Sequence, residues 1–341
     1  MRVPLAILAV LPLALAAQEN PFAWDLLPAG KTPPGFRAFS AGTGAAGGWK
    51  ISEIELPSLL NPNKTLRRKA LVHSGNQTDA AHFPALVLDT REFGDLLFKA
   101  RIRIVGGKTA PAAGLLFAHK DDRNFYITAV RRDPAQVRIA YFENGKLQNG
   151  MDAKAAARPD GWVEFALIVR GPLMYLTVNG IAYGELTLGE SRPGKIGFWT
   201  QADTTCQILD VSVGKPPTLA QQALEDAMQA STDVVELSLA AIPAGKKTAE
   251  IVASTSPKEV GKPARDSAAK LLAGGESTAT IEGEIAHVAA AIRDVNGKVI
   301  AALLVQIKTS TFGNQARYRA HGVSLANKLG ERLPSAAKLY E

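Results

Sequence analysis

Hydrophobic and polar residues alternate with a period of two through most of the chain before residue 214. In the segment 100–104, one alanine and two isoleucines alternate with two arginines, and similar alternation recurs at 137–142, 163–169 and 174–178. A period of two is typical of β-strands, because successive side chains point to opposite faces of a sheet.

Short turn signals separate these segments. They are Gly106-Gly107, Asp121-Asp122, Asp133-Pro134, Asn144-Gly145, Gly171-Pro172 and Asn179-Gly180. Many short strands with regular turns and almost no helical periodicity favour two packed antiparallel sheets. The pattern therefore predicts an all-β sandwich over residues 18–214.

The hydrophobic period changes after residue 218. Residues 219–231 place their apolar side chains on one helical stripe. The Asn-Gly pair in Asp294-Val-Asn-Gly297 is a hairpin signal. Further expected elements are strands at 234–240, 248–253, 281–292 and 298–307, a short helix at 266–272, and a closing helix with Tyr318, Leu325, Leu329 and Leu333 on one face. This order predicts an α+β domain over residues 219–341.

Residues 215–218 have the composition of a linker. Two consecutive prolines, Pro216 and Pro217, stand where the aromatic content changes. The four tryptophans all precede this point, at Trp24, Trp49, Trp162 and Trp199. Prolines at a shift in composition are typical of a boundary between domains. The sequence thus predicts two domains joined by a short hinge.

The first residues have the features of an export signal. Arg2 precedes an apolar run from Val3 to Leu15, and Ala14-Leu-Ala16 fits a signal-peptidase site. We therefore expect residues 1–17 to be a signal peptide of a bacterial periplasmic or secreted protein. The run is short for a bilayer, so no stable membrane span is expected after cleavage. An uncleaved anchor is the alternative.

The strand pattern also carries a resemblance to a known family. The segments that carry it are Phe98-Lys-Ala-Arg-Ile-Arg-Ile104, Ala113-Gly-Leu-Leu-Phe117, Asp122-Arg-Asn-Phe-Tyr126, Gly161-Trp-Val-Glu-Phe165, Leu176-Thr-Val-Asn-Gly180 and Gly194-Lys-Ile-Gly-Phe-Trp-Thr200. They resemble the concanavalin A-like, laminin-G-type jelly roll, and within it the exported bacterial 3-keto-disaccharide hydrolase-like group. The resemblance covers about residues 20–214. It implies a fold more than an activity, because the fold hosts lectins, glucanases and adhesion modules.

The second region resembles the Cache (PAS-like) extracytoplasmic sensor domain. The residues that carry this resemblance are Ile251–Gly261 and Ala289–Ala301. The resemblance implies an α+β Cache-like domain over residues 219–341. It also implies a small-molecule ligand in a pocket over the sheet.

The sequence gives little sign of catalysis. Hydrolysis of a glycosidic bond needs two carboxylates that face one cleft, and the candidate strand Ile208–Val213 holds only Asp210. Glu282 and Glu284 would point to the same face of a strand, but they lie in the other predicted domain. The lone Cys206 has no thiolate-forming context and excludes an intrachain disulfide. No catalytic residue is therefore assigned.

Metal ligation is not expected either. The five histidines are scattered without the spacing of a metal site. His119-Lys-Asp-Asp122 offers oxygen and nitrogen atoms that could hold calcium at the rim of the sandwich, but no motif supports this. The alternative is a solvated turn, because carboxylates in turns commonly cap backbone groups. We expect no cofactor.

Aromatic and polar residues of the predicted strands are candidates for sugar binding, because aromatic faces stack on sugar C–H groups and polar side chains bind hydroxyls. For the tryptophan among them, the alternative is a core position, since large aromatic side chains are usually buried. For the arginines, the alternative is a solvated face. The candidates are Arg103, His119, Tyr126, Arg138, Trp199 and Gln201.

These observations favour an exported carbohydrate-binding protein with a lectin-like sandwich and a Cache-like small-molecule module. The net charge of +7 does not by itself indicate nucleic acid binding, because the chain has no basic-aromatic repeat. Two alternatives stay open. One is a hydrolase or lyase acting on glycosidic bonds, of the 3-keto-disaccharide hydrolase-like type. The other is a structural interaction protein of the envelope.

Overall fold

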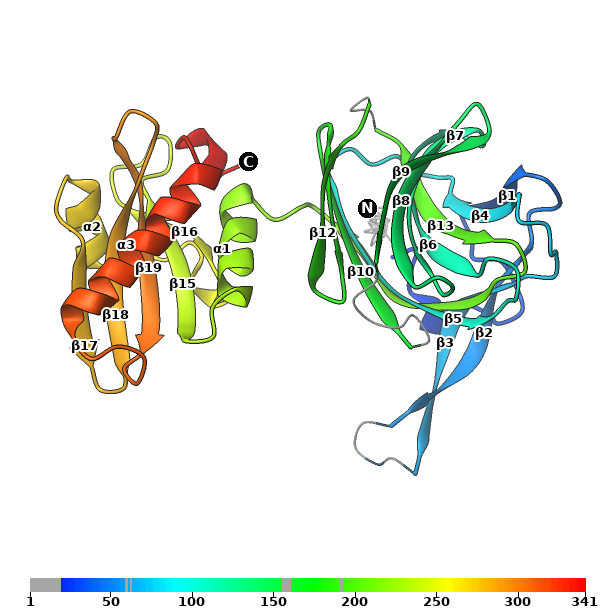
Figure 1. The fold of residues 1–341 in the computed structure, drawn as a ribbon, viewed down its shortest axis with the longest axis horizontal. Coiled ribbons are helices and arrows are strands. Elements are labelled where there is room, and N and C mark those ends of the chain that lie inside the picture. Colours follow the sequence, from blue (N-terminus) through cyan, green and yellow to red (C-terminus); the bar gives the residue numbers. More distant parts are fainter. Residues whose placement is uncertain (1–19, 59–60, 62, 155–160, 190–192) are drawn as a thin grey trace, which may run out of the picture. The chain divides into compact units, whose positions relative to one another are not determined.

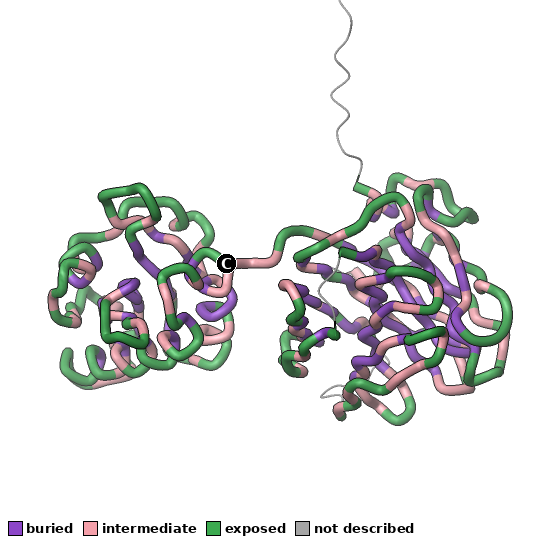
Figure 2. The backbone as a smooth tube through the Cα atoms, turned by 90° about the horizontal axis from the view of Figure 1, so that it is seen from above, coloured by how far each residue is buried: buried purple, intermediate pink, exposed green. Residues whose placement is uncertain are grey.

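The computed structural model divides into two compact units, residues 1–216 and 217–341 (Figure 1). The expected signal peptide, residues 1–17, lies outside the residues that the structure describes. Buried residues gather inside each unit separately (Figure 2). In the part of the chain described, no helix is both long and apolar enough to cross a membrane. The described residues are 20–58, 61, 63–154, 161–189 and 193–341.

The first unit contains, within its described residues, two antiparallel sheets of seven strands each. In spatial order the first sheet consists of β1 (Phe36–Gly42), β4 (His82–Leu88), β13 (Lys195–Gln201), β6 (Ala112–Asp121), β7 (Asn124–Arg131), β8 (Gln136–Glu143) and β9 (Lys146–Lys154). The second consists of β12 (Ile181–Thr187), β11 (Leu173–Val178), β10 (Val163–Arg170), β5 (Leu96–Gly106), β14 (Thr205–Gly214), β3 (Thr65–Ser74) and β2 (Gly48–Pro57). A short 3-10 helix, η1 (Trp24–Leu26), precedes β1. The prediction of an all-β sandwich is confirmed.

The period-two pattern builds the interior between the two sheets. In β5, Ala100, Ile102 and Ile104 are buried, and the two arginines between them are partly exposed. Inward-facing residues of both sheets form one apolar cluster, in which the rings of Phe98 and Phe198 lie 5.9 Å apart. Burial of apolar surface on this scale is the main stabilising term of such a sandwich.

Two predicted hairpin turns are present. Asn144 and Gly145 join β8 to β9 with φ angles of 52° and 79°, and Asn179 and Gly180 join β11 to β12 with φ angles of 51° and 75°. Two consecutive positive φ angles match the turns that Asn-Gly favours, because their twist fits the twist of the flanking strands.

The first sheet curls strongly (Figure 1). Side chains from strands far apart in its order therefore come together. Three strands separate Phe83 on β4 from Phe142 on β8, which in a flat sheet would put them about 19 Å apart at roughly 4.8 Å per strand. Their ring centroids are only 5.1 Å apart. Phe39 on β1 and Phe125 on β7 meet at 5.5 Å in the same way. The sheet face turned away from the second sheet is therefore concave.

Five aromatic side chains fill this concave face, and we term them the aromatic row: Trp199, Phe83, Phe142, Phe125 and Phe39. Trp199 stacks on Phe83 at 5.9 Å, and Phe125 stacks on Phe142 at 4.5 Å. None of the five is more than 8% exposed. The aromatic row is thus a second apolar core of the sandwich, on the other side of the first sheet.

The second unit is one antiparallel sheet with helices on both faces. Its elements are α1 (Leu219–Gln229), β15 (Val234–Ala241), β16 (Glu250–Ser254), η2 (Pro257–Glu259), α2 (Asp266–Leu272), β17 (Thr278–Glu282), β18 (Ile285–Arg293), β19 (Val299–Lys308), α3 (Gln315–Arg332) and η3 (Ala337–Leu339). The strand order is β16-β15-β19-β18-β17. Residues of α1 and α3 pack in the core on one sheet face, and α2 packs on the other.

One predicted strand of this unit is in fact two. The segment 281–292 is divided by a turn at Gly283 and Glu284, so that β17 and β18 pair as a hairpin. The apolar residues on both sides of the turn concealed it in the sequence. The hairpin predicted at Asn296-Gly297 is confirmed, because β18 pairs with β19 and Gly297 has a φ of 80°.

We expect Phe142→Ala to destabilise the first unit by about 3–5 kcal/mol, because it empties the centre of the aromatic row. All four tryptophans lie between residues 24 and 199, so tryptophan emission during urea denaturation of the full chain reports on this unit. Leu66→Ala, at a side chain that is 55% exposed, is the control and should leave the midpoint unchanged. Equal midpoints for Phe142→Ala and the wild type would contradict a packed aromatic row.

Candidate functional site

Trp199 is buried and does not offer a stacking surface. It is 0% exposed, and Phe83 covers one face of its ring. The structure therefore places this candidate in a core, in agreement with the alternative drawn from its size.

Gln201 and Arg138 lie on the same concave face as the aromatic row. Gln201 is 8% exposed and its side-chain amide donates to the carbonyl of Ala80 at 2.9 Å. Arg138 donates to both carboxylate oxygens of Asp152, at 2.8 and 2.7 Å. Both side chains are thus engaged within the protein. Gln201 is the last residue of β13 and Lys195 is the first, so the two lie at opposite ends of this strand.

Tyr126 and Arg103 do not join the other candidates. The sequence offers Tyr126 as a candidate for sugar binding, but its ring packs against the sandwich interior and its hydroxyl accepts a hydrogen bond from the Gly189 N–H at 3.1 Å. The alternation in β7 misleads because both faces of this strand are covered. Arg103 belongs to β5 in the second sheet, where it pairs with Gln207 of β14.

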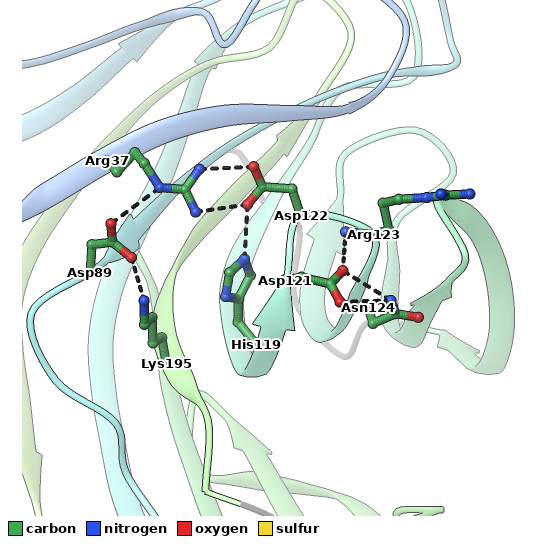
Figure 3. Close-up of polar contacts among 8 residues, drawn as sticks. All are labelled: Arg37, Asp89, His119, Asp121, Asp122, Arg123, Asn124 and Lys195. Atoms are coloured by element: carbon green, nitrogen blue, oxygen red, sulfur yellow. Dashed lines mark hydrogen bonds and ion pairs between the residues drawn. The ribbon is translucent and has the colours of Figure 1, made fainter.

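His119 lies next to the end of the aromatic row. On its other side it adjoins a group of charged residues (Figure 3). Its ring is 2% exposed and its centroid is 5.2 Å from that of Phe39. Four charged residues continue from it, and together with His119 we term them the charged cluster: Arg37, Asp89, His119, Asp122 and Lys195. These residues come from four strands that are consecutive in the first sheet, β1, β4, β13 and β6. Each contributes a residue at or next to its end, and Asp122 follows β6.

Arg37 is the centre of the charged cluster. Its two terminal nitrogens donate to the two oxygens of Asp122 at 2.8 Å each, and its Nε donates to Asp89 at 3.3 Å. Lys195 donates to the other oxygen of Asp89 at 2.5 Å. His119 Nε2 lies 3.2 Å from Asp122 Oδ1. A guanidinium that binds a carboxylate through two parallel hydrogen bonds holds it in a fixed plane.

The electrostatics of the charged cluster keep both carboxylates ionised. Hydrogen bonds from Lys195 and charges of Arg37 lower the pKa of Asp89, and the hydrogen bonds from Arg37 lower the pKa of Asp122. Bonding to Asp122 raises the pKa of Arg37. Burial lowers the pKa of His119 in spite of the neighbouring Asp122. At neutral pH the cluster therefore holds two anions, two cations and a neutral imidazole.

This charge state does not suit glycosidic hydrolysis. A general acid in such a reaction needs a carboxyl group whose pKa is raised, so that it carries a proton to donate. Asp89 and Asp122 are shifted in the opposite direction. The arrangement is suited to accepting and donating hydrogen bonds.

An open depression adjoins the charged cluster. Besides Arg37, His119, Asp122 and Lys195 it is lined by Lys120, Asp121, Arg123, Asn124 and Asn144. Asp121 caps the turn, since it accepts from the Arg123 N–H at 2.8 Å and from the Asn124 side chain at 2.9 Å. Among the described residues, no group of three or more His, Cys, Asp or Glu side chains is placed to hold a metal ion.

Sequence reasoning found only one member of the charged cluster, His119. It considered Asp122 as a calcium ligand or as a residue of a solvated turn, and it passed over Arg37, Asp89 and Lys195. A signal existed for Arg37: in a period-two strand it shares a face with Phe39. A charged residue on the same face as a buried aromatic residue indicates a fixed ion pair or a binding site.

Comparisons with known proteins give likenesses of fold alone. No family model matches the chain, and no curated protein matches it. Solved structures match about half of it. The carbohydrate-binding module CBM66 from Bacillus subtilis is 17% identical, with a TM-score of 0.38, over 50% of this chain and 96% of that chain.

Two other matches have similar extents. A Bacillus subtilis protein with a galectin-like fold is 15% identical, with a TM-score of 0.36, over 49% of this chain and 89% of that chain. A GH16 protein from Bacteroides ovatus, in complex with a glucan product, is 7% identical, with a TM-score of 0.38, over 52% of this chain and 94% of that chain. Likenesses this distant do not transfer a ligand or an activity.

We expect Arg37→Met to lower the stability of the first unit by about 1 kcal/mol, a modest loss because these side chains are partly exposed and solvent screens the pairs. Ion pairing that lowers a carboxyl pKa stabilises the fold above the ordinary pKa of 3.8, and this contribution is lost as the pH falls through the lowered values. The difference between variant and wild type should therefore shrink below pH 3.8. Urea titrations followed by tryptophan emission at several pH values measure it.

Arg67→Met serves as the matched control. Arg67 pairs with Glu55 at 3.6 Å, and its side chain is 74% exposed. This variant should match the wild type at every pH. A stability loss for Arg37→Met that stayed constant into acid would show that the charged cluster does not act through its carboxylates.

Proposed function

We propose that the first unit binds a saccharide at the charged cluster. The carrying observation is the Arg37–Asp122 pair, held on one edge of a rigid sheet beside an open depression. Adjacent sugar hydroxyls each donate and accept a hydrogen bond. Carboxylate oxygens supply acceptors and the guanidinium supplies donors, with the Asn124 and Asn144 amides in the same depression.

The ion pairs favour binding because they fix the polar groups before a ligand arrives. A site whose side chains are already ordered loses less conformational entropy when a ligand binds. The side chains of Arg37 and Asp122 are 40% and 41% exposed, so both keep surface for a ligand although they are paired. In contrast, the aromatic row is buried and cannot stack on a sugar ring without opening.

The enzyme alternative has less support at this site. A hydrolase or lyase of the 3-keto-disaccharide hydrolase-like type would need a proton donor, and the lowered pKa values of Asp89 and Asp122 disfavour that role. A structural interaction protein of the envelope would need no such depression. Export through the predicted signal peptide, residues 1–17, is part of the proposal and would place the sandwich outside the cytoplasm.

The second unit supports a second role, the binding of a small molecule. A cavity of about 270 Å³ lies over the sheet of this unit, on the face that carries α2. Its walls come from the segment between η2 and α2 and from β17. A concave site with an apolar floor and several polar groups is the usual form of a ligand pocket. This agrees with the Cache-like module expected from the sequence.

We expect Asp122→Asn to weaken saccharide binding at least about ten-fold, because it removes a charged hydrogen-bond acceptor. A glycan array of the full chain identifies the ligand, and calorimetry gives its affinity. Asp210→Asn is a matched control. Asp210 also pairs with two arginines, Arg68 and Arg101, and its side chain is 35% exposed, but it lies in β14 of the second sheet.

The two variants separate the site from general effects of lost ion pairs. Asp210→Asn should bind as the wild type does. Equal affinity of Asp122→Asn and the wild type would remove the charged cluster from the site. Release of reducing ends or turnover of a 3-keto-glucoside by the wild type would support the enzyme alternative.

A further inference from the structure

The cavity of the second unit is lined by a polar row that crosses four strands. The strand pairings place Glu236 of β15 opposite Gln306 of β19, Gln306 opposite His287 of β18, and His287 opposite Thr280 of β17. All four residues line the cavity. Neighbouring strands lie about 4.8 Å apart, so the row extends about 14 Å across the sheet. Thr280 is exposed and the other three side chains are half-buried, so the row faces the cavity rather than a packed core.

The rest of this sheet face behaves as a normal core. Ala240 and Ala302 pack there against Ala268 and Leu271 of α2. Because α2 contains only seven residues, it covers the apolar half of the face and leaves the polar row to the cavity. The change from alanine to polar residues therefore coincides with the edge of the helix.

Glu236 carries a negative charge that the described residues do not neutralise. It is half-buried, and it accepts a hydrogen bond from the Ser238 hydroxyl at 3.4 Å. The hydroxyls of Ser238 and Ser254 lie 2.8 Å apart and hold each other in place. No lysine, arginine or histidine of the described residues lies within ion-pair distance of Glu236. A half-buried carboxylate is costly unless a cation or strong donors face it.

Lysine and arginine side chains also line the cavity, but neither pairs with Glu236 among the described residues. Lys262 donates to Glu259 at 2.9 Å. Arg265 Nη1 lies 3.4 Å from His287 Nδ1, at the other side of the polar row. His287 in turn has Glu282 at 3.8 Å. The Glu236 end of the cavity is therefore acidic, whereas Arg265 places a positive charge beside His287 on the other side of the row.

We propose that this cavity binds a small molecule that carries a protonated amine. The ammonium group lies against Glu236, and hydroxyl or amide groups of the ligand meet Gln306, His287 and Thr280 along the row. This inference rests on the small-molecule role proposed for the second unit and names the chemical class. At the Glu236 end an anionic group would meet the carboxylate and be repelled, which favours a cationic group of the ligand at this end.

The test compares three probes of equal length that differ in one end group. They are 4-aminobutan-1-ol, butane-1,4-diol and 4-hydroxybutanoate, titrated into the full chain by calorimetry. We expect the amine to bind at least about ten-fold more tightly than the diol. Glu236→Gln should remove this preference, and Glu236→Asp, which keeps the charge, should retain it. Glu331→Gln is the matched control, since Glu331 is exposed on α3.

Each outcome decides the inference. Preference for the amine that is lost in Glu236→Gln and kept in Glu331→Gln supports it. Equal or tighter binding of the diol or of hydroxybutanoate overturns the amine assignment and leaves the small-molecule role in place. Binding of none of the three overturns both. Circular dichroism of Glu236→Gln verifies that the variant is folded, and the Asp variant gives a second test if it is not.

Discussion

The curl of the first sheet around the aromatic row governs the rest of this unit. Phe83 and Phe142, with three strands between them, are brought to 5.1 Å because the sheet curls. The concave face is thereby filled with apolar rings. Polar contacts are displaced to the end of the row, where His119 meets Phe39.

The same curl assembles the charged cluster. Consecutive strands of a sheet bring residues that are distant in the chain to one edge, and here Arg37, Asp89 and Lys195 come together from β1, β4 and β13. The ion pairs are partly exposed, so they contribute little to stability individually. Their more important effect is geometric, because they hold donors and acceptors in fixed directions beside a depression.

Local patterns in the sequence predicted the strands, the Asn-Gly turns and the sandwich, because these follow from alternation and turn chemistry. They did not predict the curl, which depends on which distant strands become neighbours. Tyr126 shows the consequence: both faces of β7 are covered, so alternation could not tell the interior from the outside. Trp199 could not be placed for the same reason. Arg37 had a local signal, its shared face with Phe39, but its partners had none.

The two proposed sites differ in their charge, because the first holds a fixed ion-pair network and the second holds a carboxylate without an ion-pair partner among the described residues. The account depends most on the claim that the filled concave face moves the first unit's ligand to the charged cluster. A crystal structure of the full chain with its best saccharide from the array tests this directly. The account requires sugar oxygens within hydrogen-bond distance of Arg37 or Asp122, with Trp199 still buried. A saccharide seated among opened aromatic rings, or beside Arg103 on the second sheet, would contradict it.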